Sequence, residues 1–292
     1  NAWTSYSGSG DADDNQDSQR ALIQYDHAFG DYQLTSLTGW SKYNNDRLTD
    51  SDFLSVDYLT TTYDSDYEQT SQELRLTSPT GERLEYVAGI FYLHSEMDYS
   101  TILDASFPPP FLLAGSFPLD STSLKTYDQD TDVWSLFGQG TVQLSARWRA
   151  TLGLRYTDEK KKFNGRNILF TDVLGLPGFE RIDERTFHDT NYRVALQYFM
   201  TSDVMFYGSV SNGFKSGGYS SDCFSPLPIC FNPVEPETVT TWELGMRSEF
   251  FDNRWRVNLT YFDNNYNDLQ LGGSTARGFI RFNVPQVGTN GF

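Results

Sequence analysis

The stretch with the most residues suited to phosphate binding runs from Gly208 to Ser216 and reads Gly-Ser-Val-Ser-Asn-Gly-Phe-Lys-Ser. A phosphate-binding loop needs its second glycine directly before the lysine, and it needs a helix to follow. Here Phe214 separates Gly213 from Lys215, and the surrounding residues alternate as in a strand. The spacing therefore argues against a nucleotide site.

Residue types that bind metals occur in two places. Asp11-Ala-Asp-Asp-Asn-Gln-Asp17 resembles the start of an EF-hand loop, but Gln16 replaces the turn glycine and Leu22 stands where a bidentate glutamate is needed. The three histidines fall on separate expected strands without paired ligand spacing: His27, His94 and His188. We interpret residues 11–17 as a solvated acidic loop and the three histidines as lumen or interface residues, and we predict no metal site.

Nucleophilic catalysis has no positive support, because the chain contains neither a Gly-x-Ser-x-Gly elbow nor a lone cysteine. Cys223 and Cys230 are seven residues apart in one proline-rich loop. That spacing suits a local disulfide in an oxidising compartment, with two unrelated thiols as the alternative. We expect the disulfide, no catalytic residues and no cofactor, and so a protein that is not an enzyme.

The formal net charge is −17, from 22 Lys and Arg against 39 Asp and Glu. Nucleic-acid binding needs a basic patch, and the longest basic run is Lys160-Lys161-Lys162, so no nucleic-acid partner is expected. Mean hydropathy is −0.51, and no apolar run approaches the roughly 18 residues of a spanning helix. The 22 Phe, 18 Tyr and 6 Trp suit rings at an apolar–polar interface, although an aromatic-rich soluble sandwich would share this composition.

Alternation with a period of two is strongest in residues 254–271. Apolar and polar side chains alternate there as follows: Trp255, Val257, Leu259 and Tyr261 against Arg256, Asn258 and Thr260. The same pattern recurs in residues 240–247 and 148–156, and it predicts strands with one apolar and one polar face. Because the polar faces carry charges in mid-strand, they cannot form a dry core. A membrane barrel, with lipid outside and water or a polar plug inside, accounts for both faces.

The remaining elements follow from turn residues and alternation. We expect strands at about 19–29, 32–43, 69–78, 83–98, 131–144, 148–163, 187–199, 204–218, 236–250, 254–271 and 276–284. Long loops are expected at 1–17, 44–67, 99–130 and 164–186, with Pro108-Pro109-Pro110 excluding a central strand and Pro285 breaking the last one. Short turns at one rim and long loops at the other are typical of outer-membrane barrels.

Closure of such a barrel requires every strand edge to be paired, because unpaired backbone groups in lipid are costly. About 10–11 antiparallel strands with ends at opposite rims would not close by themselves. The residues before Phe292 also lack the alternation of a final barrel strand. We therefore expect an all-β segment of a larger barrel, with residues 1–292 as one partial domain lacking an N-terminal plug and the C-terminal strands.

Three successive segments resemble TonB-dependent outer-membrane receptors. Tyr207-Gly-Ser-Val-Ser-Asn-Gly-Phe-Lys-Ser-Gly-Gly-Tyr219 is similar to one barrel strand, Pro236-Glu-Thr-Val-Thr-Thr-Trp-Glu-Leu-Gly245 to the next, and residues 261–271 to a third. Residues 283–292 resemble the approach to the strand after that. In the family these motifs are architectural, and the matching positions are Asn212, Gly213, Phe214, Lys215, Gly217, Gly218, Glu237, Glu243, Gly245 and Asp268.

The resemblance implies a multi-pass barrel of about 22 strands in the Gram-negative outer membrane, in contact with its lipid. It implies uptake of a scarce nutrient, most often a ferric siderophore or another metal chelate, driven by TonB through an N-terminal region without a counterpart here. A passive porin and a non-transport surface β-protein remain open as alternatives. The acidic balance disfavours phosphate-like substrates but does not choose among siderophore, haem, cobalamin and glycan.

The ligand-binding residues remain unknown at this level. Long loops commonly carry binding residues, so loop aromatics are candidates for a ligand vestibule. The candidates are Tyr58, Tyr63, Phe107, Phe111 and Phe117.

Overall fold

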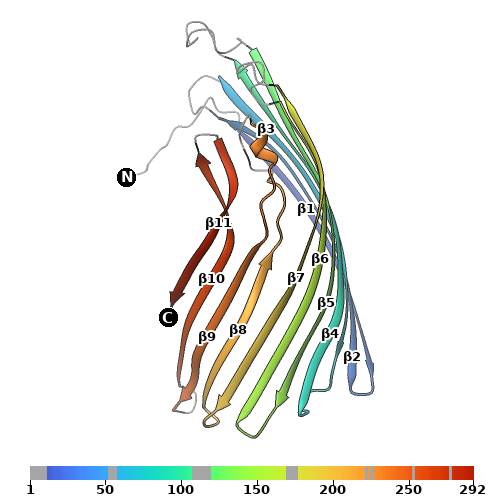
Figure 1. The fold of residues 1–292 in the computed structure, drawn as a ribbon. Coiled ribbons are helices and arrows are strands. Elements are labelled where there is room, and N and C mark those ends of the chain that lie inside the picture. The colour runs from blue at the N-terminus through green and yellow to red at the C-terminus, as the bar shows by residue number, and fades with distance from the viewer. Residues whose placement is uncertain are drawn as a thin grey trace.

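The computed structural model describes residues 12–51, 58–106, 120–168, 177–220, 223, 227–251, 254–275 and 278–292. These form one antiparallel sheet of 11 strands in which each strand pairs with the next along the chain. The sheet curves around one side, with short turns at one rim and the longer connections at the other (Figure 1). The strands are β1 (Asp13–Phe29), β2 (Tyr32–Asp50), β3 (Leu59–Thr77), β4 (Leu84–Ser106), β5 (Asp120–Gln143), β6 (Trp148–Asn167), β7 (Phe179–Phe199), β8 (Val204–Lys215), β9 (Glu237–Phe250), β10 (Trp255–Thr275) and β11 (Gly278–Gly291). The predicted all-β, antiparallel, barrel-like class is confirmed.

The strands are longer than predicted at the rim of the long connections. Most of the described part of the expected loops 44–67, 99–130 and 164–186 is strand, since β2 continues to Asp50, β4 to Ser106 and β5 from Asp120. The ladder continues there although the apolar residues of these stretches no longer alternate regularly with polar ones, so the pattern that marks a strand disappears. Pro108, Pro109 and Pro110 lie outside the described residues.

The expectation that Pro285 ends the last strand is wrong. Strand β11 continues through it, and the register skips only the position opposite, between Asn267↔Gln286 and Leu269↔Val284. Asp268, at the skipped position, has a positive φ of 52°, and its carbonyl accepts a hydrogen bond from Asn283 Nδ2 at 2.7 Å. Proline lacks an N–H group, so an edge strand can accommodate it where one ladder bond is missing.

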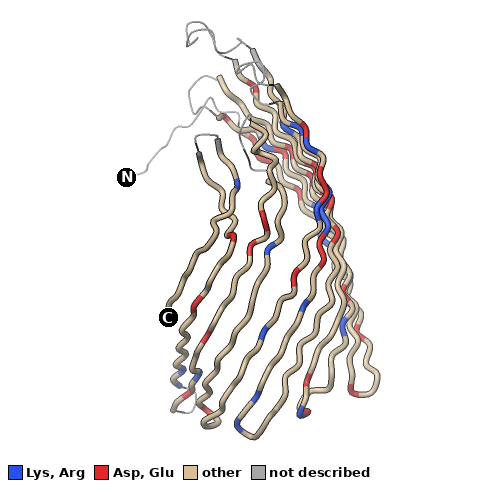
Figure 2. The backbone as a smooth tube through the Cα atoms, in the orientation of Figure 1, with Lys and Arg blue, Asp and Glu red and all other residues tan. Residues whose placement is uncertain are grey.

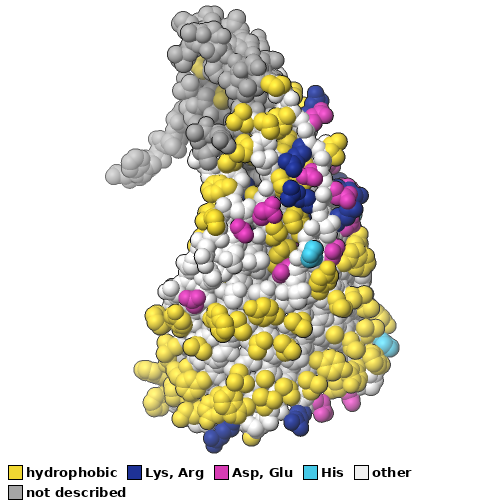
Figure 3. Space-filling model, in the orientation of Figure 1, with side chains coloured by type: hydrophobic (Ala, Val, Ile, Leu, Met, Phe, Trp, Pro, Cys, Tyr) yellow, Lys and Arg dark blue, Asp and Glu magenta, His cyan; other side chains and the backbone are white. Residues whose placement is uncertain are grey.

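The two faces of the sheet differ as the alternation predicts. Trp148, Leu152, Trp255 and Leu259 are 40%, 55%, 66% and 61% exposed, respectively. Figure 3 shows hydrophobic side chains gathered in a band over the half of the sheet nearest the short turns, which we call the apolar belt. Charged residues concentrate beyond this belt, along the upper parts of the strands in Figure 2. Within the described residues, no helix is long and apolar enough to cross a membrane.

Candidate ligand-binding site

The connection between β8 and β9 folds against the inner, concave face of the sheet. We call residues 216–236 the strap; its described part contains the short helix η1 (Pro228–Phe231). In Figure 1 the helix lies between the upper parts of β5–β7 and the β10–β11 hairpin. The side chains that contact the strap identify the inner face, because neighbouring residues of a strand point to opposite faces.

Polar side chains of β5 and β6 hold the strap at its backbone. Lys125 Nζ donates to the carbonyl of Cys223 at 2.7 Å, and the Tyr127 hydroxyl donates to the carbonyl of Tyr219 at 3.3 Å. Lys161 Nζ donates to the carbonyl of Gly217 at 2.8 Å. Lys125 is only 2% exposed, so these bonds operate away from bulk water, where breaking one leaves a costly unpaired group.

An aromatic cluster completes the attachment. The rings of Phe163 and Tyr219 stack with centroids 4.1 Å apart, and Phe231 meets Phe163 edge-on at 5.2 Å. Cys223 and Cys230, the predicted pair, are bonded to each other with their Cα atoms 5.3 Å apart, and both are buried in this cluster. Such ring pairs stabilise by about 0.5–1.5 kcal/mol beyond their buried area.

The far side of the strap is bonded to β10 and β11. Gln270 Nε2 donates to the carbonyls of Ser216 at 2.9 Å and Glu235 at 3.1 Å. The backbone N–H of Glu235 donates to Asn283 Oδ1 at 2.9 Å. The strap is therefore fastened on both sides and forms a fixed part of the inner surface.

Asp183 on β7 forms part of this attachment. The Tyr219 hydroxyl and the Arg181 guanidinium beside it hold the pKa of Asp183 at about 2. Burial and the neighbouring Asp183 carboxylate in turn raise the pKa of Tyr219. An ionised carboxylate and a neutral phenol therefore lie next to each other where the strap meets β7.

Beside the strap, the inner face of β2–β4 is lined with tyrosines. Tyr43 pairs across the strands with Tyr67, which pairs with Met97. Tyr63 lies farther along β3, and its ring centroid is 6.5 Å from that of Tyr99. All five side chains are partly exposed, so they offer ring faces and hydroxyl groups to the space enclosed by the sheet. We call Tyr43, Tyr63, Tyr67, Met97 and Tyr99 the tyrosine wall.

The outer face at the same height is acidic. Three cross-strand rows place carboxylates directly opposite one another: Asp46↔Asp64, Asp66↔Asp98↔Asp128 and Glu68↔Glu96↔Asp130. Burial and the neighbouring carboxylates raise the pKa of Asp64 and of Asp128, because like charges oppose ionisation. Lys42 and Lys162 flank the third row, and the outside of the wall as a whole remains negative.

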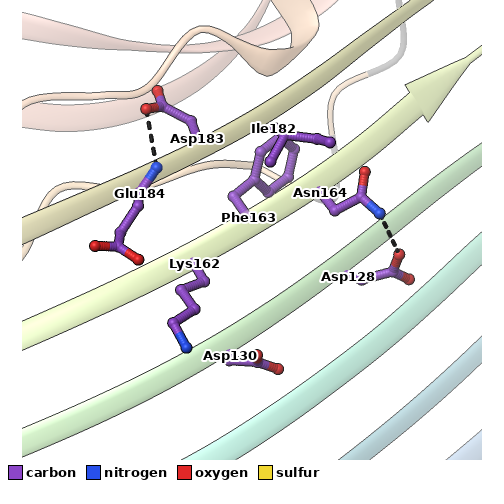
Figure 4. A pocket seen from close by; sticks show the side chains of 8 residues that line it. All are labelled: Asp128, Asp130, Lys162, Phe163, Asn164, Ile182, Asp183 and Glu184. Carbon is purple, nitrogen blue, oxygen red and sulfur yellow. Dashed lines mark hydrogen bonds between the residues drawn. The ribbon is translucent and has the colours of Figure 1, made fainter.

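A hollow of about 430 Å³ lies at the end of this surface, over β5–β7. Figure 4 shows Asp128, Asp130, Lys162 and Glu184 around it, with Asn164 Nδ2 donating to Asp128 Oδ2 at 3.4 Å. Its lining consists of four carboxylates with Lys162, Asn164, Phe163 and Ile182, and it is a charged depression of the surface.

Asn212, the first of the family-motif residues, bonds to β7 at the point where β8 separates from it. The β7–β8 ladder ends at Arg193↔Ser211. Beyond it, Asn212 Oδ1 accepts from the N–H of Tyr192 at 2.6 Å, and Asn212 Nδ2 donates to the carbonyl of Thr190 at 3.2 Å. One side-chain amide thereby replaces the next backbone pair, which frees the chain to turn inward as the strap.

Two motif glycines make room for neighbouring rings. The ring of Tyr207 lies over Gly245, where a Cβ would collide with it, and the Tyr207 hydroxyl reaches Thr260 Oγ1 at 3.0 Å. Gly217 packs in the same way against Phe187. These two glycines therefore leave room for neighbouring aromatic rings.

The remaining motif positions are distributed along the strap and its neighbours. Lys215 faces Glu237 across β8 and β9, and Glu237 Oε2 accepts from the N–H of Gln270 at 2.8 Å. Gly213 and Phe214 lie in β8, Glu243 in β9, Gly218 beside Lys161, and Asp268 opposite Pro285. None of the motif positions belongs to the tyrosine wall.

Metal ligation finds no support among the described residues, where no group of three His, Cys, Asp or Glu side chains converges. The three histidines lie on three different strands, β1, β4 and β7, and His94 contacts Asp132 at 2.9 Å. Asp13 to Asp17 begin strand β1, which corrects the interpretation of that stretch as an acidic loop.

Sequence reasoning found one member of the wall and missed the others. Tyr63 was expected as a loop residue but lies in β3, and Tyr58 just precedes that strand. Phe107, Phe111 and Phe117 lie outside the described residues. The sequence does contain a signal for these residues. Tyrosines occupy odd positions and acidic residues the even positions of the same stretch, as Tyr63 and Tyr67 do beside Asp64, Asp66 and Glu68.

Comparisons with known proteins give one family and many structures of similar fold. The family model described as "TonB dependent receptor-like, beta-barrel" matches residues 1–292. The ferric yersiniabactin uptake receptor FyuA from Yersinia pestis superposes with a TM-score of 0.71 at 19% identity, covering 89% of this chain and 37% of that one. The siderophore receptor PiuA from Acinetobacter baumannii gives 0.67 at 15%, covering 94% and 43%. The copper transporter OprC gives 0.69 at 12%, with the same coverage as PiuA. The chain thus spans less than half the length of these structures.

Proposed function

The chain belongs to the TonB-dependent receptor-like β-barrel family, and we propose that it is the ligand-binding part of an outer-membrane transporter for a metal chelate. TonB would supply the energy through an N-terminal region of the whole protein that lies outside these residues. The lipid of the outer membrane would contact the apolar belt, and the chelate would enter at the rim of the long connections.

One observation carries the proposal: the tyrosine wall and the fixed strap lie side by side on the inner face of the sheet, where Met97 and Tyr99 also pack against the aromatic cluster that holds the strap. Rings and hydroxyl groups from β2–β4 and the bonded strap together form this inner surface. Ligand sites are lined by aromatic groups with a few polar atoms, and this surface has such a lining. The solved structures of similar fold include receptors whose names state siderophore and ferric-chelate uptake, which supports the same substrate class.

Uptake by the whole protein tests the proposal. The intact gene is expressed in a Gram-negative strain without its own ferric-chelate receptors, and growth on a panel of ferric chelates is followed under iron limitation. We expect growth on at least one chelate, loss of that growth when tonB is deleted, and a reduction when Tyr67 becomes alanine. The matched control is Thr70→Ala, on the outward face of the same strand.

The contrary outcomes are equally specific. Growth that survives tonB deletion would indicate passive diffusion, and conductance of the purified protein in planar bilayers would then support a porin. Failure on every chelate, with the protein folded in the outer membrane, would contradict chelate uptake.

A further inference from the structure

We propose that the chelate recognised at the tyrosine wall carries no net negative charge, as in a ferric trihydroxamate. This inference rests on the proposed function and specifies its ligand. Three singly charged hydroxamates neutralise ferric iron, whereas three doubly charged catecholates leave the complex a trianion. The two complexes are comparable in size, so the charge of the site decides between them.

The inner surface beyond the apolar belt is almost uncharged. On β2–β5, the inward positions at this height carry hydroxyl, amide, thioether and aromatic groups, and the charged residues among them are Arg47 and Lys125. Phenol faces and hydroxyl groups suit a neutral ligand, because they stack and hydrogen-bond without compensating a charge. Moving a trianion from water onto such a surface would cost free energy that nothing on the surface repays.

The nearest buried cation is already engaged. Lys125 Nζ donates to the Cys223 carbonyl, and its nitrogen lies 5.7 Å from the ring centroid of Tyr99. The cations on the other side of the strap are held in the same way: Lys161 contacts Glu159 at 3.0 Å, and Arg185 contacts Glu235 at 3.5 Å. Arg47 is exposed and makes no ion pair among the described residues, so it offers one charge against three.

The outer face adds a repulsive field. The opposed carboxylates of β2–β5 point outward, and a sheet only one residue thick separates them from the wall. This separation is on the order of the Debye length, which is about 8 Å at physiological ionic strength, so the charges are only partly screened. Of the two connections that follow the strands of the wall, residues 52–57 carry two aspartates and residues 107–119 carry no charge. A negative field lowers the local concentration and the association rate of an anion, and it leaves a neutral ligand unaffected.

A titration of the whole purified protein in detergent separates the two classes. Ferric complexes of several trihydroxamates and several tricatecholates are titrated by quenching of tryptophan fluorescence, at low and at high salt. We expect the best trihydroxamate to bind at least about tenfold more tightly than any tricatecholate, a difference of about 1.4 kcal/mol. We also expect its dissociation constant to be independent of salt. Tighter binding of a tricatecholate that weakens with salt would overturn the inference and leave chelate uptake standing, whereas no binding of either class would overturn both.

A pair of variants places the effect on the wall. Ser65 lies on the inward face of β3 between Asn45 and Tyr99, whereas Thr62 points outward on the same strand. Ser65→Lys should strengthen tricatecholate binding by about tenfold, because a charge at contact distance is worth more than a distant one. Thr62→Lys adds the same charge and should change it by less than about threefold. Equal effects of the two variants would overturn recognition at the wall.

Discussion

Single side chains decide how the strap leaves the sheet. The amide of Asn212 stands in for a missing backbone pair, and Asp183 supplies the charge beside Tyr219. Both act on the strap, and neither belongs to the tyrosine wall. Substitutions at these residues should therefore alter the attachment of the strap first.

Asn212→Ala should leave the N–H of Tyr192 and the carbonyl of Thr190 without their bonds. The expected loss is about 1–3 kcal/mol of unfolding free energy, because two hydrogen bonds of about 0.5–1.5 kcal/mol each are removed. Faster hydrogen exchange at the Tyr192 amide measures it directly. Asn191→Ala is the control, because that side chain bonds only to Asp189, and equal exchange in both variants would refute the role of Asn212.

Asp183 makes the attachment of the strap sensitive to acid. Its pKa of about 2 lies below the ordinary value of 3.8, so its contribution to stability is complete above about pH 4 and is lost as pH falls toward 2. The difference in thermal midpoint between the native protein and Asp183→Asn should therefore shrink across that window. A difference that stays constant down to pH 2 would contradict the assignment.

At the scale of elements, the strap is held in place by an aromatic cluster that is tightly packed. A Cβ on Gly165 would approach the ring of Phe231 to 2.9 Å, and it would also collide with Phe163. Gly153, on the same face of the same strand, has only the flexible Gln139 side chain nearby. Comparing substitutions at Gly165 and Gly153 therefore separates an effect on the packing of the strap from an effect on strand β6 itself.

Gly165→Val should displace Phe231 and destabilise the strap by about 1–3 kcal/mol, the usual effect of overpacking. The buried Cys223–Cys230 disulfide reports this loss. We expect its reduction and alkylation under native conditions to accelerate by about tenfold or more in Gly165→Val. Gly153→Val should leave the rate unchanged; an unchanged rate in both variants would mean that the strap does not depend on the cluster.

The elements also show what sequence can predict. Alternation from Trp148 to Tyr156 located β6, because one of its faces is apolar. It failed in residues 44–50, which are mostly polar on both faces, and in residues 99–106, where the apolar Ile102 and Leu103 are neighbours on opposite faces and do not alternate with polar residues. The position of the strap could not be predicted for another reason. Lys125 contacts Cys223 across nearly a hundred residues of sequence, and Phe163 contacts Tyr219 across more than fifty. Local patterns carry no information about such pairs.

At the scale of the whole molecule, three surfaces are separated: an apolar belt, an acidic outer rim and a neutral inner wall. Leu152→Arg should test the belt, because a lipid-facing arginine costs up to about 2–4 kcal/mol depending on its depth. Thr151→Arg, which faces inward, is the control. The measurement is the free energy of unfolding from lipid vesicles, and equal losses in the two variants would contradict the assignment of the faces.

If the tyrosine wall is a ligand surface, a bound chelate should shield it from a polar maleimide. Tyr67→Cys and Asp66→Cys are labelled in the whole receptor, with and without the ferric chelate that supports growth. We expect the chelate to slow labelling at position 67 by about tenfold or more and to leave the labelling rate at position 66 unchanged. Unprotected labelling at position 67 with the chelate bound would contradict it.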